Sequence, residues 1–225
     1  MTLPTPYYDR DGITIFNADC RDVLPFLEPV DLVLTDPPYG IAYSTNHKVR
    51  GVGATWIGQQ IANDCDASVR DAVLAMLSDI PAIVFGSWKV SRPVLTKAVL
   101  VWDKGPAFGM GDLSFPWKPS WEEIYVIGDG FQGSRDEGVI KGLTGVSWES
   151  KGRMHPNEKP VKLLAYLLSK HPGETILDPF MGSGTTLRAA KDLGRRAIGI
   201  ELEERYCEIA VKRLQQSVMA LEVPA

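Results

Sequence analysis

The feature that most constrains the fold is the alternation of short apolar segments with amphipathic ones along the whole chain. Most of the apolar segments are continuous runs rich in valine and isoleucine, as expected for strands covered on both faces. The seven predicted strands are residues 12–16, 31–35, 82–86, 98–102, 123–127, 174–177 and 195–200. The predicted helices are residues 67–78, 160–171, 185–193 and 203–221. This order predicts an α/β fold with a seven-stranded, mostly parallel, doubly wound sheet, whose ligands bind beyond the carboxyl ends of the strands.

Composition excludes several other classes of protein. A chain of 225 residues with 44% hydrophobic and 23% charged residues can bury a core without disulfides, which excludes disordered and collagen-like chains. Its apolar runs are far shorter than the roughly 20 residues of a membrane span, and the first residues lack the features of a signal peptide. The three cysteines are unevenly spaced, and no HExxH or CxxC pattern occurs. We therefore expect one cytoplasmic domain over residues 1–225, with no membrane partner and no metal.

The distribution of charge allows a nucleic-acid partner although the net charge is −4. An acidic protein gains no general attraction to phosphates, which normally supply much of the affinity for DNA. However, residues 1–36 carry seven acidic and two basic side chains, whereas residues 86–119 and 141–162 each carry five basic and two acidic ones. Two interpretations stay open at this point: one positive face, or charges scattered over a solvated surface.

A glycine-rich turn follows the predicted strand at residues 174–177 and precedes a helix. Gly182 and Gly184 let the backbone approach a ligand, and Thr185 and Thr186 offer hydroxyls beside the free N–H groups of the helix. Such a turn either serves structure alone or binds a nucleotide-like ligand.

The residues around this turn favour a nucleoside that carries an amino acid. Glu201 ends the next predicted strand, where a carboxylate can accept hydrogen bonds from both hydroxyls of a ribose. A dinucleotide site would need a third glycine where Leu187 stands. Asp178 would also repel a pyrophosphate, and it would attract an amino group instead.

A second turn, Asp36-Pro37-Pro38-Tyr39, follows the apolar segment at residues 31–35. Its two prolines fix the backbone and cannot donate hydrogen bonds, so the carbonyl of Pro37 is a rigid acceptor. The carboxylate of Asp36 is a second acceptor, and Tyr39 adds a flat aromatic face. This arrangement suits a planar ligand with an exocyclic amino group, such as adenine or cytosine.

Together the two turns resemble the catalytic and cofactor motifs of S-adenosylmethionine-dependent DNA amino-methyltransferases. Because the Asp-Pro-Pro-Tyr turn precedes the glycine-rich turn, the chain is similar to the circularly permuted beta class of that family over nearly its whole length. Residues 16–20 and 155–160 are similar to the family segments that line or lead into the cofactor site. The catalytic residues that the resemblance implies are Asp36, Pro37, Pro38 and Tyr39. The residues that it implies for binding S-adenosylmethionine are Asp19, Cys20, Lys159, Asp178, Phe180, Gly182, Ser183, Gly184, Thr185, Thr186 and Glu201.

The resemblance also implies a mechanism and a substrate. A base flipped out of double-stranded DNA stacks on Tyr39, and its amino group donates hydrogen bonds to Asp36 and to the carbonyl of Pro37. The amine then attacks the methyl group directly, without a covalent enzyme intermediate. Aspartate at the first position of the motif favours adenine N6, and cytosine N4 is the alternative. Restriction-modification in a bacterial cell or a phage-infected bacterium is the setting implied.

Contacts with DNA are expected from two irregular segments, residues 41–65 and 128–157, because long segments without clean periodicity in a compact domain are usually functional. The DNA-binding residues that we expect are His47, Lys48, Arg50, Lys151 and Arg153. Loops this short indicate a recognition site of a few base pairs, or reliance on a second subunit in a homodimer.

Other functional classes fit the sequence less well. A nicotinamide oxidoreductase would need the third glycine and has no use for the Asp-Pro-Pro-Tyr turn. A non-catalytic nucleic-acid-binding module has no reason to keep both turns. Methyltransferases that act on RNA or on protein glutamine usually place the glycine-rich turn first.

Overall fold

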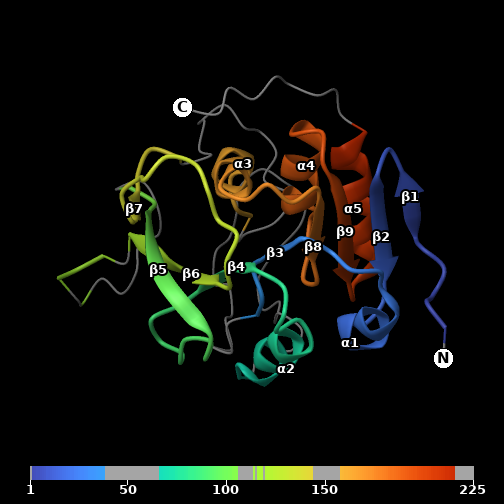
Figure 1. The fold of residues 1–225 in the computed structure, drawn as a ribbon, viewed down its shortest axis with the longest axis horizontal. Coiled ribbons are helices and arrows are strands. Elements are labelled where there is room, and N and C mark those ends of the chain that lie inside the picture. The colour runs from blue at the N-terminus through green and yellow to red at the C-terminus, as the bar shows by residue number, and fades with distance from the viewer. Residues whose placement is uncertain are drawn as a thin grey trace.

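One β-sheet positions every other element of the structure. The computed structural model describes residues 2–38, 66–105, 114, 116–118, 120–143 and 158–215. Within these residues the sheet has nine strands in the order β1-β2-β9-β8-β3-β4-β6-β5-β7 (Figure 1). The strands are β1 (Tyr8–Arg10), β2 (Ile13–Asn17), β3 (Leu32–Thr35), β4 (Ala82–Gly86), β5 (Thr96–Asp103), β6 (Trp121–Ile127), β7 (Val139–Ile140), β8 (Thr175–Asp178) and β9 (Arg196–Glu201). Strands β2, β9, β8, β3 and β4 are mutually parallel, and β6 runs antiparallel between β4 and β5.

The predicted α/β class and mostly parallel sheet are confirmed, but the number of strands differs from the prediction. All seven predicted segments form strands, and two further strands, β1 and β7, lie at the two edges of the sheet. Strand β1 has the polar sequence Tyr-Asp-Arg, and β7 is only two residues long. Edge strands are covered less completely than central ones and need no continuous apolar run, so a pattern that detects buried strands misses them.

Helices cover both faces of the sheet, as a doubly wound fold requires. The helical elements are α1 (Cys20–Val23), the 3-10 helix η1 (Leu24–Phe26), α2 (Ser68–Met76), α3 (Val161–Ser169), α4 (Thr185–Asp192) and α5 (Glu204–Leu214). Helices α3, α4 and α5 lie on one face, and α1 and α2 lie on the other (Figure 1). The four predicted helices are present, although residues 216–221 of the last one lie outside the described residues. None of the helices in the described ranges is long and apolar enough to cross a membrane.

The central strand β3 sends its side chains into two separate buried layers. Leu32 and Leu34 pack in the cluster that contains residues of α3, α4 and α5. Val33 packs in the opposite cluster, together with Val73 of α2. All three β3 side chains are fully buried. The carboxyl end of β3, from which Asp36 follows, is therefore held between two packed layers.

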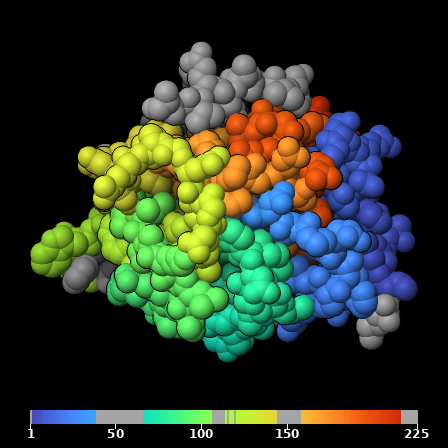
Figure 2. Space-filling model, viewed as in Figure 1, coloured from blue at the N-terminus to red at the C-terminus, as the bar shows by residue number. Residues whose placement is uncertain are grey.

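Segments from the beginning and the end of the described chain lie side by side. Strand β2 pairs in parallel with β9, from Ile13 opposite Ala197 to Asn17 opposite Glu201. The space-filling view shows the blue N-terminal residues directly against the orange and red C-terminal ones (Figure 2). The carboxyl ends of β2 and β9 consequently reach the same edge of the sheet.

Strands β8 and β3 mark the point where the strand order reverses. They are parallel neighbours, with Leu32 opposite Ile176 and Val33 opposite Leu177. The next strand after β8 lies on one side of this pair, and the next strand after β3 lies on the other. In doubly wound sheets ligands bind beyond the carboxyl ends at such a reversal, which is where both predicted functional turns begin.

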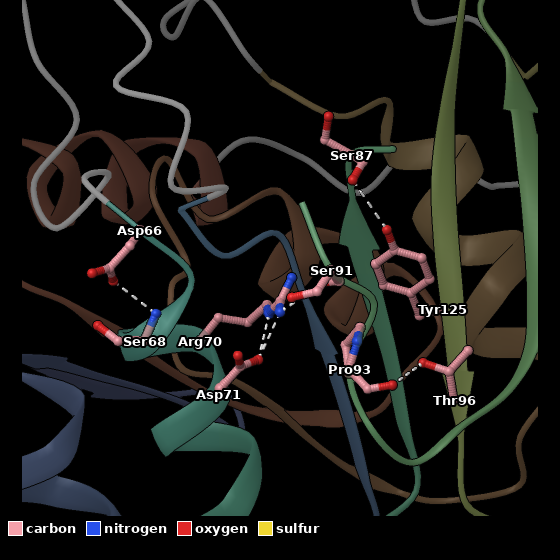
Figure 3. A network of polar contacts seen from close by, with 9 residues as sticks. All are labelled: Asp66, Ser68, Arg70, Asp71, Ser87, Ser91, Pro93, Thr96 and Tyr125. Carbon is pink, nitrogen blue, oxygen red and sulfur yellow. Dashed lines mark hydrogen bonds and ion pairs between the residues drawn. The ribbon is translucent and has the colours of Figure 1, made fainter. Parts of the chain in front are cut away.

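A network of polar contacts anchors the segment that follows β4 (Figure 3). The hydroxyl of Tyr125 donates to the carbonyl of Ser87 at 3.3 Å, and the guanidinium of Arg70 donates to the carbonyl of Ser91 at 2.9 Å. Arg70 also pairs with Asp71 at 2.7 Å, although its side chain is 3% exposed. Since α2 and β6 both contribute to this network, the segment has a fixed path beside the carboxyl end of β4.

We predict that Gly86→Ala lowers the free energy of unfolding by about 1–3 kcal/mol, the usual result of overpacking. A Cβ at Gly86 would lie 2.1 Å from Cε2 of Tyr125, and this ring is fully buried. Urea unfolding measures the change. Gly138→Ala is the matched control, because a Cβ at Gly138 would meet no described atom within 4 Å. Equal losses in the two variants would contradict the role of Gly86 in packing.

Candidate active site

A buried carboxylate lies where β8 ends beside β3. Oδ1 of Asp178 accepts hydrogen bonds from Oγ1 of Thr35 at 2.7 Å and from the backbone N of Phe180 at 3.2 Å. Burial raises the pKa of Asp178 to about 6, and the nearby carboxylate of Asp36 acts in the same direction. The negative charge of Asp178 is thus poorly solvated, and a cationic ligand would stabilise it.

The glycine-rich turn packs closely against α5. Gly184 has a left-handed φ of 76°, and a Cβ there would lie 2.6 Å from the Cβ of Ala210. Glycine is therefore required at this position. At Gly182 a Cβ would meet no described atom within 4 Å, so the described part of the chain leaves room beside the turn on that side. The side chains of Ser183 and Thr185 are buried in the turn itself.

The carboxylate of Glu201 joins the end of β9 to this turn. Oε2 accepts a hydrogen bond from the backbone N of Gly182 at 3.0 Å, and Oε1 accepts one from the backbone N of Glu203 at 2.8 Å. Burial raises the pKa of Glu201. Each carboxylate oxygen can accept a second hydrogen bond, so the group is an oriented acceptor for hydroxyls beside the glycine-rich turn.

Asp19 and Cys20 follow β2, whose last residue is Asn17. The side chain of Asn17 donates a hydrogen bond to the carbonyl of Glu201 at 3.0 Å, which holds the ends of β2 and β9 together. Asp19 caps α1 by accepting a hydrogen bond from the backbone N of Arg21 at 2.9 Å. The side chain of Arg21 also bonds to Asp19 and lowers the pKa of this carboxyl. Burial raises the pKa of Cys20 to about 11, so this thiol is neutral at pH 7 and is a poor nucleophile.

Lys159 contacts Asp36, the first residue of the Asp-Pro-Pro-Tyr turn, directly. Its Nζ lies 2.5 Å from Oδ2 of Asp36 and 3.2 Å from Oε2 of Glu122, and Lys104 pairs with the other oxygen of Glu122 at 2.9 Å. Burial disfavours the charged form of Lys159, but the carboxylates of Asp36 and Glu122 outweigh this effect and raise the pKa of Lys159. The resemblance implies a cofactor contact for Lys159, and the geometry adds an ion pair with the proposed catalytic carboxylate.

Most of the predicted site residues therefore meet at one edge of the sheet. Asp36, Pro37 and Pro38 follow β3, and the predicted cofactor residues cluster around the ends of β2, β8 and β9, except Lys159, which lies just before α3. Among the described residues there is no cluster of three or more His, Cys, Asp or Glu side chains that could hold a metal ion. The predicted residues that lie outside the described ones are Tyr39, His47, Lys48, Arg50, Lys151 and Arg153.

The sequence interpretation missed Thr35, Glu122 and Arg213. Arg213 of α5 donates to Oγ1 of Thr185 at 2.6 Å and pairs with Glu158 at 2.8 Å, which links the segment before α3 to the glycine-rich turn. A signal for all three existed in the sequence. Thr35 is a polar residue within an otherwise apolar strand, Glu122 is one of two glutamates at the start of β6, and Arg213 falls on the buried stripe of its helix.

Comparisons with known proteins identify the family. The N6_N4_Mtase model, described as DNA methylase, matches residues 101–212. The type II methyltransferase M2.DpnII of Streptococcus pneumoniae is 51% identical, and the alignment covers 96% of this chain and 94% of that protein. This chain belongs to the DNA methylase family. It is accordingly a DNA methyltransferase of the class that modifies exocyclic amino groups.

Solved structures of methyltransferases share the fold. The M1.HpyAVI–SAM complex has a TM-score of 0.60 and 25% identity, and the match covers 90% of this chain and 100% of that one. The cytosine-N4-specific PvuII DNA methyltransferase has a TM-score of 0.67 over 97% of this chain and 89% of its own. Its identity is 14%, so this second likeness concerns the fold alone.

We predict that Asp178→Asn stabilises the ligand-free DNA methyltransferase at pH 7.5 by about 1–3 kcal/mol, since one pKa unit corresponds to about 1.4 kcal/mol. The folded-state pKa of about 6 lies above the ordinary value of 3.8, so the folded state binds the proton more tightly than the unfolded state. The protonated carboxyl of Asp178 therefore stabilises the fold at low pH, and this stabilisation is lost as the pH rises from about 4 through 6. The amide retains an oxygen for Thr35 without the buried charge.

Urea unfolding at several pH values measures this effect. The advantage of Asp178→Asn should shrink towards zero at pH 4, where the parent carboxyl is protonated in the fold. Asp129→Asn is the matched control, because the Asp129 side chain is 88% exposed. A variant less stable than the parent at pH 7.5 would show that the Asp178 charge supports the ligand-free fold.

Proposed function

We propose that this DNA methyltransferase transfers the methyl group of S-adenosylmethionine to N6 of an adenine flipped out of double-stranded DNA. The observation that carries the proposal is the side-by-side arrangement of β3 and β8. Strand β3 delivers Asp36, an acceptor for an amino group, and β8 delivers Asp178, a buried carboxylate suited to a cation. Methyl donor and methyl acceptor thus have adjacent sites at one edge of the sheet.

The residues around the glycine-rich turn fit S-adenosylmethionine. The pKa values of Asp178 and Glu201 are both raised by burial, and neither carboxylate has a cationic partner in an ion pair among the described residues. The described residues leave room beside Gly182, and the carboxylate oxygens of Glu201 are oriented towards this turn. A ligand with a cationic amino acid end and a ribose would satisfy both carboxylates. The SAM complex of M1.HpyAVI, with its similar fold, supports this assignment.

Each residue of the cofactor site has a distinct task in this proposal. Asp178 binds the ammonium group of the methionine part, and Glu201 accepts hydrogen bonds from the ribose hydroxyls. Gly182 allows the backbone to approach the ligand, Gly184 lets the turn pack against α5, and the adjoining helix α4 directs free N–H groups towards the ligand. When bound, S-adenosylmethionine supplies an electrophilic methyl group, so the protein has to orient the acceptor and exclude water.

The residues after β3 orient the acceptor amine. The carboxylate of Asp36 and the carbonyl of Pro37 accept hydrogen bonds from the two N–H groups of the base, which favours a tetrahedral nitrogen with its lone pair free for attack. Stacking on Tyr39 would return about 1–3 kcal/mol of the energy needed to flip the base. Aspartate at the first position of this turn favours adenine N6 over cytosine N4.

The remaining proposals concern DNA. We infer that residues 41–65 and 128–157 contact the duplex, with phosphate contacts from His47, Lys48, Arg50, Lys151 and Arg153. The short loops support a recognition site of a few base pairs or a homodimer in which both subunits contribute. The relative M2.DpnII is named a type II methyltransferase, which supports a role in restriction-modification inside a bacterial cell.

Transfer of labelled methyl from S-adenosylmethionine to DNA, followed by digestion to nucleosides, tests the proposed function. The parent should yield N6-methyladenine, and Asp36→Ala should lower the transfer rate by about 100- to 1,000-fold, as does the loss of one oriented group in other active sites. Its affinity for S-adenosylmethionine should be unchanged. Asp129→Ala is the exposed control. N4-methylcytosine as the product would overturn the choice of base, and absence of transfer by the parent would overturn the function.

We predict that Glu201→Ala weakens binding of S-adenosylmethionine by about 1.5–3 kcal/mol, or roughly 10- to 150-fold, because it removes hydrogen bonds to a charged acceptor. Titration calorimetry measures the affinity, with and without a chelator, and the chelator should have no effect. Glu208→Ala is the control, since Glu208 lies on α5 with its side chain 56% exposed. Equal affinities of the two variants for S-adenosylmethionine would show that Glu201 does not contribute to the cofactor site.

A further inference from the structure

Four charged side chains form a continuous series of ion pairs that ends at Asp36, the proposed catalytic carboxylate. Lys104, just after β5, pairs with Glu122 of β6 at 2.9 Å. Glu122 pairs with Lys159, just before α3, at 3.2 Å, and Lys159 pairs with Asp36 at 2.5 Å. Segments that are far apart in the sequence therefore converge on one side of Asp36.

The two middle residues of this series, Glu122 and Lys159, are largely shielded from solvent, which distinguishes their contact from a surface ion pair. The Lys159 side chain is 7% exposed and the Glu122 side chain 21%, whereas in the surface pair of Lys97 with Asp129 the exposures are 54% and 88%. Removing a charge from water is expensive, and a buried pair is on balance weak evidence for added stability. A buried lysine that contacts the catalytic turn therefore calls for a functional explanation.

The surroundings of Lys159 fix where its ammonium group can be. Nζ lies 4.9 Å from the centre of the Phe85 ring, on β4. The register of β3 and β4 places Thr35 opposite Val84, so Phe85 follows at the level of Asp36. The ammonium group is thus held between an aromatic face, Glu122 and Asp36. The hydrogen bond that Nζ of Lys159 donates to Oδ2 of Asp36 restrains the rotation of that carboxylate.

We infer that Lys159 is a positioning residue that holds the Asp36 carboxylate in one orientation for the target amine, and that Glu122 holds Lys159 in turn. This inference rests on the proposed role of Asp36 as acceptor for the amine. A fixed carboxylate spares the enzyme the reorganisation that a freely rotating one would need before transfer. The role differs from a cofactor contact, because it acts on the rate of transfer and leaves the binding of S-adenosylmethionine unchanged.

The first test is Lys159→Met, which retains most of the side-chain volume without the charge. Single-turnover methyl transfer at saturating cofactor and DNA should fall by about 10- to 100-fold, since small displacements of a reacting group have effects of this size. The dissociation constant for S-adenosylmethionine, measured by calorimetry, should stay within about twofold of the parent. Lys97→Met is the matched control, because it removes the same charge from an ion pair of the same length, 2.5 Å, and should transfer methyl at the parent rate.

A double-mutant cycle separates positioning from general structural damage. In an Asp36→Asn background, which loses the carboxylate that Lys159 holds, Lys159→Met should cause little further loss of rate. Glu122→Gln, which leaves Lys159 in place with a weaker partner, should lower the rate of the parent by a smaller factor. If Lys159→Met does not fold, Glu122→Gln and its combination with Asp36→Asn provide the same comparison.

Several outcomes would overturn the inference without touching the proposed function. A parent-like rate in Lys159→Met would exclude positioning, and a higher rate would show that the ion pair restrains Asp36 instead. Weakened binding of S-adenosylmethionine with an unchanged rate of transfer would make Lys159 a cofactor residue. Equal losses in the parent and Asp36→Asn backgrounds would show that Lys159 acts independently of Asp36. Failure of the proposed function would appear separately, as absence of methyl transfer by the parent.

Discussion

The hydrogen bond from Thr35 to Asp178 is the constraint on which the site depends. It joins the last residue of β3 to the last residue of β8, across a separation of 143 residues in the sequence. Both groups are buried, so the bond replaces part of the solvation that each group loses on folding. Together with the pairing of β3 and β8, it fixes the starting points of the two turns relative to each other, while β2 and β9 bring Asp19 and Glu201 to the same edge.

The site accumulates buried charge that a purely structural core would avoid. Asp178 and Glu201 are carboxylates whose pKa values are raised by burial, and both lie at the carboxyl ends of strands. A protein can tolerate such groups when a ligand later compensates them, which is one form of the trade-off between stability and activity. The series of ion pairs from Lys104 to Asp36 differs from these two carboxylates, because each of its charges already has a partner of opposite sign.

Much of the fold could be predicted from the sequence, because the central strands are continuous apolar runs and two turns carry distinctive chemistry. The edge strands β1 and β7 could not be predicted from the same pattern, since neither has a continuous apolar run. The contacts of Lys159 were also beyond prediction. They depend on β6, which lies antiparallel between β4 and β5 and delivers Glu122 to this side of the sheet. The sequence motifs therefore located the two turns. Only the three-dimensional arrangement revealed the ion pairs of Lys159 with Asp36 and Glu122.

The pairing of β3 with β8 and of β2 with β9 also governs how the chain acquires its site during synthesis. Contacts between residues so distant in sequence form late, because the entropy of closing a long loop must be overcome before they bring any gain. A nascent chain that has emerged only as far as β6 carries Asp36, but it has neither Asp178 nor Glu201 to complete the edge. Its central strand β3 also lacks its neighbour β8 and exposes one row of unpaired backbone groups. The site is thus completed, and the central strand is protected against aggregation, at the same stage of synthesis. Both require that β8 and β9 have left the ribosome.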